Sequence, residues 1–374
     1  MTHRMGWLLN LIVISSITAG CAGAASDSRT PSPSPKYSGP PPTILDLEGD
    51  ITHVHDPAII REGGTYYLFS TGLALTEVIP IRCSRDLRNW RRCGDVFPAI
   101  PQWASQDVPG VKNLWAPDIS YFDGRYHLYY SASTFGSNHS SIGLATNKSL
   151  DPKSPEYQWV DQGKVIESRR FNDWNAIDSN VVIDDEGRPW LSFGSFWDGI
   201  KLRRLDHSTG KLSGADTKLY SIASRPRGPG SPGAVEAPFL IRRNGYYYLL
   251  VSFDSCCKGA QSTYKIMVGR SKQVTGPYLD RAGNPMWAGG GTLLIAGSGR
   301  WRGPGHNAVL LEQDGDKIIY HAYDTQRGGI PTLRIGSLVW DDHGWPLAAN
   351  PNSAAISSIW FIARLNPEPR GPEQ

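Results

Sequence analysis

One pattern recurs five times along the chain: a polar stretch, an apolar strand, a turn with glycine and an aromatic strand. The copies are His55–Ser70, Trp115–Ser131, Asp178–Phe193, Glu236–Ser252 and His306–Tyr323. Their turn glycines, Gly64, Gly124, Gly187, Gly245 and Gly315, follow one another at steps of 60, 63, 58 and 70 residues. Apolar and aromatic runs around Asp-Gly or Asn-Gly predict β-hairpins. Hairpins repeated at this spacing predict a β-propeller.

The predicted fold is all-β, with five blades in a single domain over residues 43–365. Further strand candidates lie between the hairpins, at 141–146, 201–205 and 266–270, and no segment has a sustained helical period. The alternative is a two-sheet β-sandwich in which the similarity of the copies is accidental. In a propeller the first strand of each blade lines the central channel, so we expect equivalent residues to converge there and form the active site.

Composition fits this fold and narrows the partners. The 374 residues include 13 Trp, 16 Tyr and 40 Gly, a mixture of strand-forming aromatics and turn residues that favours an all-β protein. The formal net charge is only +3, so nothing points to nucleic acid as a partner. We expect a monomer without an organic cofactor.

The N-terminus reads as an export signal over residues 1–20. A basic start precedes the apolar run 7–17, which is too short for a membrane-spanning helix. Thr18-Ala19-Gly20-Cys21 resembles a lipobox, in which Cys21 is lipidated; the alternative is ordinary cleavage nearby, for example after Ala25. Residues 21–42 are rich in Ser and Pro and predict a tether, and residues 366–374 form a tail. The protein is therefore expected to be a bacterial envelope lipoprotein or secreted.

The other four cysteines form two candidate pairs. Cys83 and Cys93 flank a hairpin-like segment and can pair after export. Cys256 and Cys257 are adjacent, so a bond between them closes a small ring. Neither pair has zinc-site spacing, and we expect structural roles for all four.

One position of the repeat collects reactive side chains. Counting back nine residues from each turn glycine reaches His55, Trp115, Asp178, Glu236 and His306, with Asp56 beside His55. Hydrolysis of a glycosidic bond needs one protonated and one ionised carboxyl group across the bond. A third carboxylate nearby keeps the acid protonated, because its negative charge opposes ionisation. Asp56, Asp178 and Glu236 supply this set, whereas Asp118 is out of phase and is expected to be structural.

Aromatic residues on the loops beside this position suggest a sugar-binding groove. Trp115, Phe135, Phe196 and Trp197 are either core residues or rings that stack on the apolar faces of sugars. His306 is either a hydrogen-bond partner or, on the channel axis, a ligand that holds a metal directly or through water.

Eight segments resemble glycoside hydrolase family 43, and within it the endo-α-1,5-L-arabinanases. They are His53–Pro57, Leu114–Ile119, Ser133–Asn138, Asn175–Asn180, Ser192–Trp197, Val235–Pro238, Asp254–Gly259 and Gly305–Asn307. The resemblance covers about residues 50–345. It implies a five-bladed propeller that inverts anomeric configuration.

The resemblance also implies roles for single residues. Asp56 matches the general base, Glu236 the general acid, and Asp178 the carboxylate that raises the pKa of the acid and orients it. His306 matches the histidine beside a central metal, usually calcium held largely through waters. Asn175, Gly136 and Ser195–Trp197 match substrate-contacting segments. The full set of expected substrate-binding residues is His55, Trp115, Phe135, Gly136, Asn175, Asn180, Ser195, Phe196 and Trp197.

The resulting prediction is an exported endo-arabinanase that cuts internal α-1,5 links of linear arabinan. The first alternative is an exo-acting α-L-arabinofuranosidase or β-xylosidase. Such enzymes are expected to close one end of the groove with loops or an added β-sandwich, for which no length remains after residue 365. The second alternative is a carbohydrate-binding propeller without catalysis, but binding a neutral glycan does not need three carboxylates.

Overall fold

The computed structural model describes residues 36–73, 78–228 and 233–351. The expected signal, Cys21, most of the tether, residues 352–365 and the tail lie outside this part. The compact unit begins at Lys36, earlier than the expected residue 43, since the backbone N–H of Lys36 donates to the Asp342 carboxylate at 3.0 Å. No helix in the described ranges is long and apolar enough to cross a lipid bilayer.

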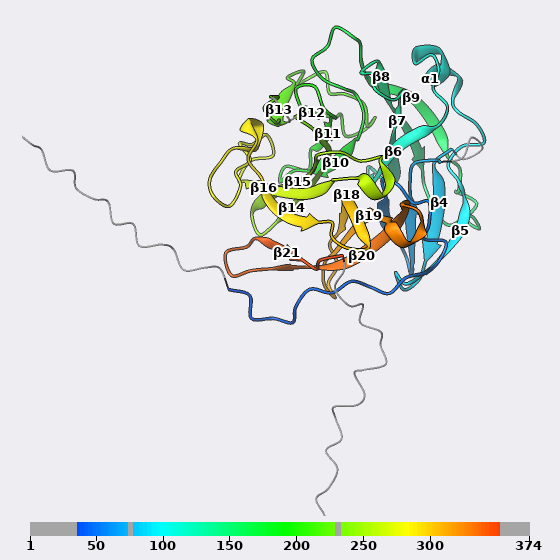
Figure 1. Ribbon diagram of the computed structural model, residues 1–374. Helices are drawn as coiled ribbons and strands as arrows, with labels where there is room; N and C mark the ends of the chain where they lie inside the picture. Colours follow the sequence, from blue (N-terminus) through cyan, green and yellow to red (C-terminus); the bar gives the residue numbers. More distant parts are fainter. Residues whose placement is uncertain (1–35, 74–77, 229–232, 352–374) are drawn as a thin grey trace, which may run out of the picture. The chain divides into compact units, whose positions relative to one another are not determined.

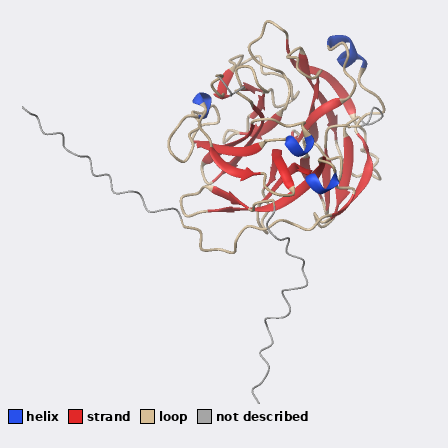
Figure 2. Cartoon of the chain, in the orientation of Figure 1, coloured by secondary structure: helices blue, strands red, loops and turns tan. Residues whose placement is uncertain are grey.

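Five antiparallel sheets of four strands form the blades of a propeller, as predicted (Figures 1 and 2). Blade one contains β2 (Ala58–Glu62), β3 (Thr65–Phe69), β4 (Pro80–Ser84) and β5 (Asn89–Asp95), with β1 (Glu48–Gly49) added parallel to β5. Blade two contains β6 (Leu114–Phe122), β7 (Arg125–Ala132), β8 (Ser140–Asn147) and β9 (Val160–Ser168). Blade three contains β10 (Asn180–Ile183), β11 (Pro189–Phe193), β12 (Ile200–Arg204) and β13 (Tyr220–Ala223).

The remaining blades have the same order of strands. Blade four contains β14 (Val235–Arg243), β15 (Tyr246–Phe253), β16 (Lys265–Ser271) and β17 (Thr292–Ala296). Blade five contains β18 (Trp301–Leu310), β19 (Lys317–Asp324), β20 (Ile330–Trp340) and β21 (Pro346–Ala348). Helical segments in the described part are short: α1 (Gln102–Asp107) and the 3-10 turns η1 (Gly259–Gln261), η2 (Met286–Ala288) and η3 (Thr325–Arg327).

The first strands of the blades meet in a closed ring. β2 contacts β6, β6 contacts β10, β10 contacts β14, β14 contacts β18, and β18 contacts β2. Five clusters of buried apolar side chains lie between neighbouring blades; Ala58, Phe69 and Leu128, for example, belong to the cluster between blades one and two. The blades are therefore held together by apolar burial on both sheet faces, and the first strands lie at the centre.

The segment before β2 closes the ring between blades five and one. Residues 43–52 pair with β20, through backbone hydrogen bonds such as Leu45 N–H to the Ile335 carbonyl at 2.8 Å. The same segment pairs with blade one, since β1 lies beside β5. The N-terminal segment thus ties the last blade to the first.

Turn chemistry explains the hairpins and also one error in the expected alignment. Blades two and four use the two-residue turns Asp123-Gly124 and Asn244-Gly245, in which all four residues have positive φ, as a type I′ turn requires. Blade one also has a two-residue loop, Gly63-Gly64. The loops of blades three and five are longer, spanning 184–188 and 311–316. A fixed count back from the glycine therefore reaches different structural positions in different blades.

Candidate active site

Just before each first strand, or near its start, one residue has a left-handed backbone. These residues are Asp56, Ala116, Asp178, Ala237 and His306, with φ between 44° and 58°. Four of their N–H groups donate to a side chain on or just after the second strand of the preceding blade: Asp56 to His321 Nδ1, Ala116 to Thr71 Oγ1, Asp178 to Ser131 Oγ and His306 to Ser252 Oγ. This shared backbone conformation and bonding mark the equivalent positions of the five blades.

These five left-handed residues correct the alignment of the repeats that was expected from the sequence. Asp56, Asp178 and His306 occupy one equivalent position, and Asp56 is in phase rather than displaced by a residue. Glu236 precedes the marker residue Ala237 and is therefore equivalent to His55 and Trp115. The chemistry is divided between two consecutive positions of the repeat, not collected at one.

Blade three breaks the bonding pattern and thereby brings two carboxyl groups together. The position that supplies the side chain in other blades is held by Gly194, where a Cβ atom would lie 2.4 Å from the Gly199 carbonyl oxygen. The N–H of Ala237 instead donates to Asp178 Oδ2 at 3.1 Å. Asp178 is thus bonded to the residue that follows Glu236.

Asp56 lies among imidazoles. Its Oδ1 is 2.8 Å from His55 Nδ1 and 3.0 Å from His306 Nδ1, and its Oδ2 accepts a hydrogen bond from the Thr71 hydroxyl at 2.5 Å. Burial alone would raise the pKa of Asp56, but the charges and hydrogen bonds of His55 and His306 outweigh it and hold the pKa well below its usual value. Asp56 is therefore ionised at neutral pH.

Among the described residues, no cationic side chain forms an ion pair with Glu236 or Asp178. Glu236 Oε2 accepts from the Ser195 hydroxyl at 2.5 Å, and Oε1 is bonded to the Tyr264 hydroxyl. Burial raises the pKa of Glu236, against the two hydroxyl hydrogen bonds, and burial raises the pKa of Asp178 to about 8, with the charges of Glu236 and Asp56 adding to it. The pair therefore retains a proton at neutral pH.

His306 is the positive group between these carboxylates. Burial disfavours its charge, yet Asp56, Asp178 and Glu236 together raise the pKa of His306 to about 9. It belongs to no group of three closely spaced metal-ligating side chains within the described ranges. Two such groups do occur, His55–Cys256–Cys257 and His55–Asp56–His321, but their atoms are engaged in a disulfide and in hydrogen bonds.

The predicted groove residues are placed in different ways. Phe135 is 84% exposed, on the loop that also carries Gly136, and Trp115 is half-buried, with its Nε1 donating to Asn113 at 2.8 Å. Phe196 and Trp197 are half-buried and both have positive φ, which is costly for large side chains and is concentrated at functional sites. Asn175 is buried, with its Oδ1 unpartnered among the described residues.

Three predicted substrate-binding residues have other contacts. Asn180 is buried, its Nδ2 donating to Asp118 and its Oδ1 accepting from Leu240 N–H, so it joins blades two, three and four. Both ring nitrogens of His55 are occupied, by Asp56 and by the Tyr323 hydroxyl. Ser195 is buried, and its hydroxyl holds Glu236. All three side chains thus make hydrogen bonds within the protein, and their predicted binding of substrate stays a prediction.

Four residues of the site were not among the predicted ones: Thr71, Tyr264, His321 and Tyr323. Thr71 follows the second strand of blade one, and His321 lies in the second half of the second strand of blade five, where blades two and four have Ser131 and Ser252. A polar residue recurring in or just after the later part of the aromatic strand was the signal that could have found them. Tyr264 precedes β16, and no repeated spacing indicates it.

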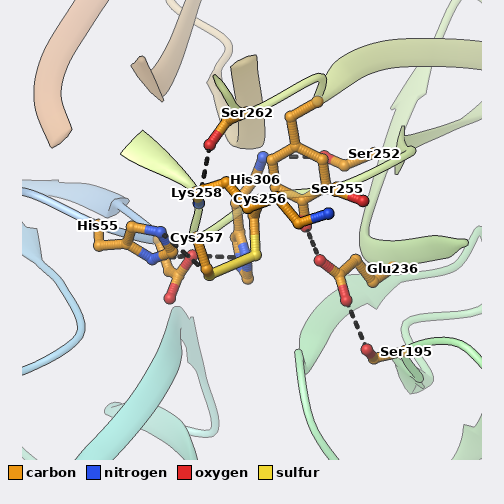
Figure 3. The surroundings of a disulfide bond; sticks show 12 residues. His55, Ser195, Glu236, Ser252, Ser255, Cys256, Cys257, Lys258, Ser262 and His306 are labelled. Atoms are coloured by element: carbon orange, nitrogen blue, oxygen red, sulfur yellow. Dashed lines mark hydrogen bonds and ion pairs between the residues drawn. A yellow bond between two sulfur atoms is a disulfide. The ribbon is translucent and has the colours of Figure 1, made fainter. Parts of the chain in front are cut away.

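Both candidate cysteine pairs form disulfides, and Figure 3 shows the second beside the site. Cys83 pairs with Cys93 across β4 and β5, and Cys256 pairs with its neighbour Cys257. The latter bond lies on the loop between β15 and β16, with Cys257 Sγ 3.8 Å from His55 Nε2.

Comparison with known proteins gives consistent matches over the propeller. An extracellular endo-α-(1→5)-L-arabinanase of Bacillus subtilis is 48% identical over 294 residues, which cover 78% of this chain and 87% of that one. An extracellular exo-α-(1→5)-L-arabinofuranosidase of Cellvibrio japonicus is 46% identical over 301 residues, covering 78% and 85%. The solved endo-arabinanase of Bacillus licheniformis is 50% identical with a TM-score of 0.74, covering 81% and 99%.

A family model matches the same part of the chain. The model of glycosyl hydrolases family 43 spans residues 51–346, from the segment before β2 to the start of β21. This range contains Asp56, Asp178 and Glu236 and the first three strands of every blade. The chain therefore belongs to glycosyl hydrolases family 43.

Proposed function

We propose that this protein hydrolyses α-1,5-L-arabinofuranosidic links within linear arabinan. The observation that carries the proposal is the contrast among three buried carboxyl groups, since Asp56 is held ionised while Glu236 and Asp178 retain a proton. A glycosidase needs this combination, and a module that only binds a neutral glycan does not. The endo-arabinanases of the two Bacillus species support arabinan as the substrate.

In the proposed mechanism, Asp56 is the general base and Glu236 the general acid. Ionised Asp56 takes a proton from water as the water attacks the anomeric carbon, and Glu236 gives its proton to the leaving oxygen. Asp178 accepts a hydrogen bond from Ala237 N–H and lies close enough to Glu236 that ionisation of either carboxyl group opposes ionisation of the other. Attack by water opposite the leaving group inverts the configuration of the sugar.

Product size on linear arabinan tests the proposal. An endo-acting enzyme releases a mixture of oligosaccharides early and lowers viscosity quickly, and we expect this result. Release of one short product from chain ends would favour exo action instead. Binding of arabinan without any cleavage would indicate a carbohydrate-binding propeller that has no catalytic activity.

The exo alternative is favoured by one observation. The exo-acting relative from Cellvibrio japonicus is nearly as similar as the endo-acting one, and the match covers 85% of its length. An added β-sandwich domain, which we expected of exo-acting enzymes, therefore does not distinguish exo from endo action here. Comparing linear, debranched and branched arabinan shows whether the groove is open at both ends and how wide it is.

We further propose that calcium binds beside His306, largely through waters. Calcium prefers oxygen ligands, and the side chains of Asn307 and Ser179, which directly follow His306 and Asp178, are buried with polar atoms that have no partner among the described residues. These residues fit an ion with a water shell better than a cage of protein ligands. The ion would add positive charge next to the carboxylates. Chelation is expected to lower both the melting temperature and kcat, and calcium, but not magnesium, is expected to restore them.

Export is proposed from the first 20 residues and supported by the word extracellular in the names of two relatives. We propose lipidation at Cys21. Cell fractionation of the wild type and of Cys21→Ser tests this point, because the variant should leave the membrane fraction if Cys21 carries the lipid. Equal fractionation would indicate a secreted protein without an anchor.

A further inference from the structure

We propose that the Cys256–Cys257 disulfide is a positioning element of the active site, because it shapes a loop that reaches both Asp56 and Glu236. This loop spans residues 254–264, between β15 and β16. The inference rests on the proposed function, since it assigns this loop to the hydrolysis of arabinan. In Figure 3 the disulfide lies next to His55, with Glu236 and Ser195 on its other side in this view.

Hydrogen bonds within the loop hold its conformation in addition to the disulfide. Ser255 and Thr263 exchange hydrogen bonds, with Thr263 N–H donating to the Ser255 carbonyl at 2.9 Å and Ser255 N–H donating to the Thr263 hydroxyl at 3.2 Å. Lys258 N–H donates to the Ser262 hydroxyl at 3.0 Å. These bonds fix the two ends and the middle of the loop relative to β15 and β16.

On the side of the base, the disulfide leads to Asp56 through two side chains. Cys257 N–H donates to the Tyr323 hydroxyl oxygen at 2.8 Å, and that hydroxyl lies 2.8 Å from His55 Nε2. Because ionised Asp56 can only accept, His55 donates its Nδ1–H to Asp56 Oδ1 at 2.8 Å, and the Tyr323 hydroxyl holds the other ring nitrogen. The backbone of Cys257 therefore fixes the orientation of the imidazole that holds Asp56.

On the side of the acid, the end of the same loop contacts Glu236. Tyr264 is buried, and its hydroxyl is bonded to Glu236 Oε1. Its backbone N–H donates to the Ser255 carbonyl at 3.2 Å, so Tyr264 is tied to the residue just before the disulfide. A shift of the loop would thus displace hydrogen-bond partners of the acid and of the base together.

The disulfide matters for this geometry because Cys257 has a φ of 64°. A residue with a Cβ atom rarely adopts this left-handed conformation unless its surroundings hold it there. A bond between the two adjacent side chains restricts the backbone of both residues. Without the bond, the N–H of Cys257 is free to turn away from Tyr323.

The first experiment compares two double variants of the full chain. Cys256→Ser/Cys257→Ser is expected to lower kcat on linear arabinan about tenfold or more, since small displacements of reacting groups cost up to about 100-fold. KM should change much less. The matched control, Cys83→Ser/Cys93→Ser, removes the disulfide of β4 and β5, which is remote from the three carboxylates, and should lower thermal stability without changing kcat below the melting transition.

Tyr323→Phe tests whether the disulfide acts through the proposed contacts. This change removes the hydroxyl between Cys257 and His55 and should lower kcat in the wild-type background. In the Cys256→Ser/Cys257→Ser background it should add little, because the contact is already lost. Full additivity of the two effects would contradict the proposed route.

Reduction provides a version of the test without substitutions at the loop. In the Cys83→Ser/Cys93→Ser background, an added dithiol breaks the Cys256–Cys257 bond, each sulfur gains one electron and one proton, and the dithiol is oxidised to its own disulfide. kcat should fall on reduction and recover on reoxidation, with circular dichroism unchanged. An unchanged kcat, or a rise in KM alone, would overturn the inference while leaving the proposed function intact. A wild type inactive on arabinan would overturn the proposed function and this inference with it.

Discussion

The site has two halves that are equally buried and oppositely protonated. Asp56, Asp178 and Glu236 are each only 6–7% exposed. Asp56 is surrounded by His55, His306 and His321, contributed by blades one and five. Glu236 and Asp178, from blades four and three, are bonded instead to hydroxyl groups and a backbone N–H.

Burial alone does not determine which of these three carboxyl groups is protonated. Burial pushes the pKa of all three carboxyl groups upward, and only Asp56 has cationic partners close enough to reverse that effect. The imidazole half is therefore suited to accept a proton and the hydroxyl half to donate one. Substitutions that act on one half only should separate these two capacities.

The largest expected effect on kcat comes from removing either the proton donor Glu236 or the proton acceptor Asp56. Glu236→Gln should lower kcat on arabinan about 1,000-fold, within the range for general acid catalysis, but much less on an aryl arabinoside whose leaving group needs no proton. Asp56→Asn should lower kcat by a similar factor on both substrates, because attack by water needs the base in each case. Steady-state kinetics on the two substrates measure this.

Asp123→Asn is the control, since Asp123 lies in the β6–β7 turn with positive φ and outside the site. It should leave kcat unchanged. If Glu236→Gln were equally damaging on both substrates, the assignment of Glu236 as the acid would be wrong.

A smaller effect is expected from Asp178→Asn, which weakens the contrast between the halves. Activity requires ionised Asp56 and protonated Glu236, so it should decline on the alkaline side as Glu236 loses its proton. Negative charge on either member of the Asp178–Glu236 pair opposes ionisation of the other, so removing the ionisable group of Asp178 should lower the pKa of Glu236 and move the alkaline limb of kcat to lower pH. An unmoved or upward-shifted limb would contradict the proposed tuning.

The smallest effect is expected outside both halves, at Phe135. Its side chain is 84% exposed, so Phe135→Ala should leave the melting temperature unchanged. Loss of stacking worth about 1 kcal/mol should raise KM about fivefold and leave the pH profile of kcat in place. Leu293→Ala, at an exposed position on β17, is the matched control and should alter neither quantity.

The fold could be predicted because its signals are local. Asp123-Gly124 and Asn244-Gly245 specify tight hairpins through their own backbone preferences, and each is flanked by strand-forming residues. The register of the site could not be predicted as well, because the longer loops at 184–188 and 311–316 change the distance from glycine to channel. A constant count therefore placed Asp178 and His306 with His55, Trp115 and Glu236, although they are equivalent to Asp56.

The partners of the carboxylates were harder to predict than the carboxylates themselves. Tyr264 reaches Glu236 from a loop, and His321 reaches Asp56 from the second strand of another blade, so both contacts depend on how blades pack. Asn180 shows the opposite case. Its segment resembles a substrate-contacting one, yet its amide is used between blades, which only the packed structure reveals.

Infrared difference spectroscopy of the protonated carboxyl band at pH 7 tests whether Asp56 is ionised while the Glu236–Asp178 pair keeps a proton. We expect the band of the wild type to persist in Asp56→Asn and to be strongly reduced in Asp178→Asn/Glu236→Gln, because the retained proton belongs to Glu236 and Asp178. A remainder from Asp118, whose pKa burial raises to about 6, should be common to all variants. Loss of the band in Asp56→Asn, with persistence in the double variant, would contradict the account.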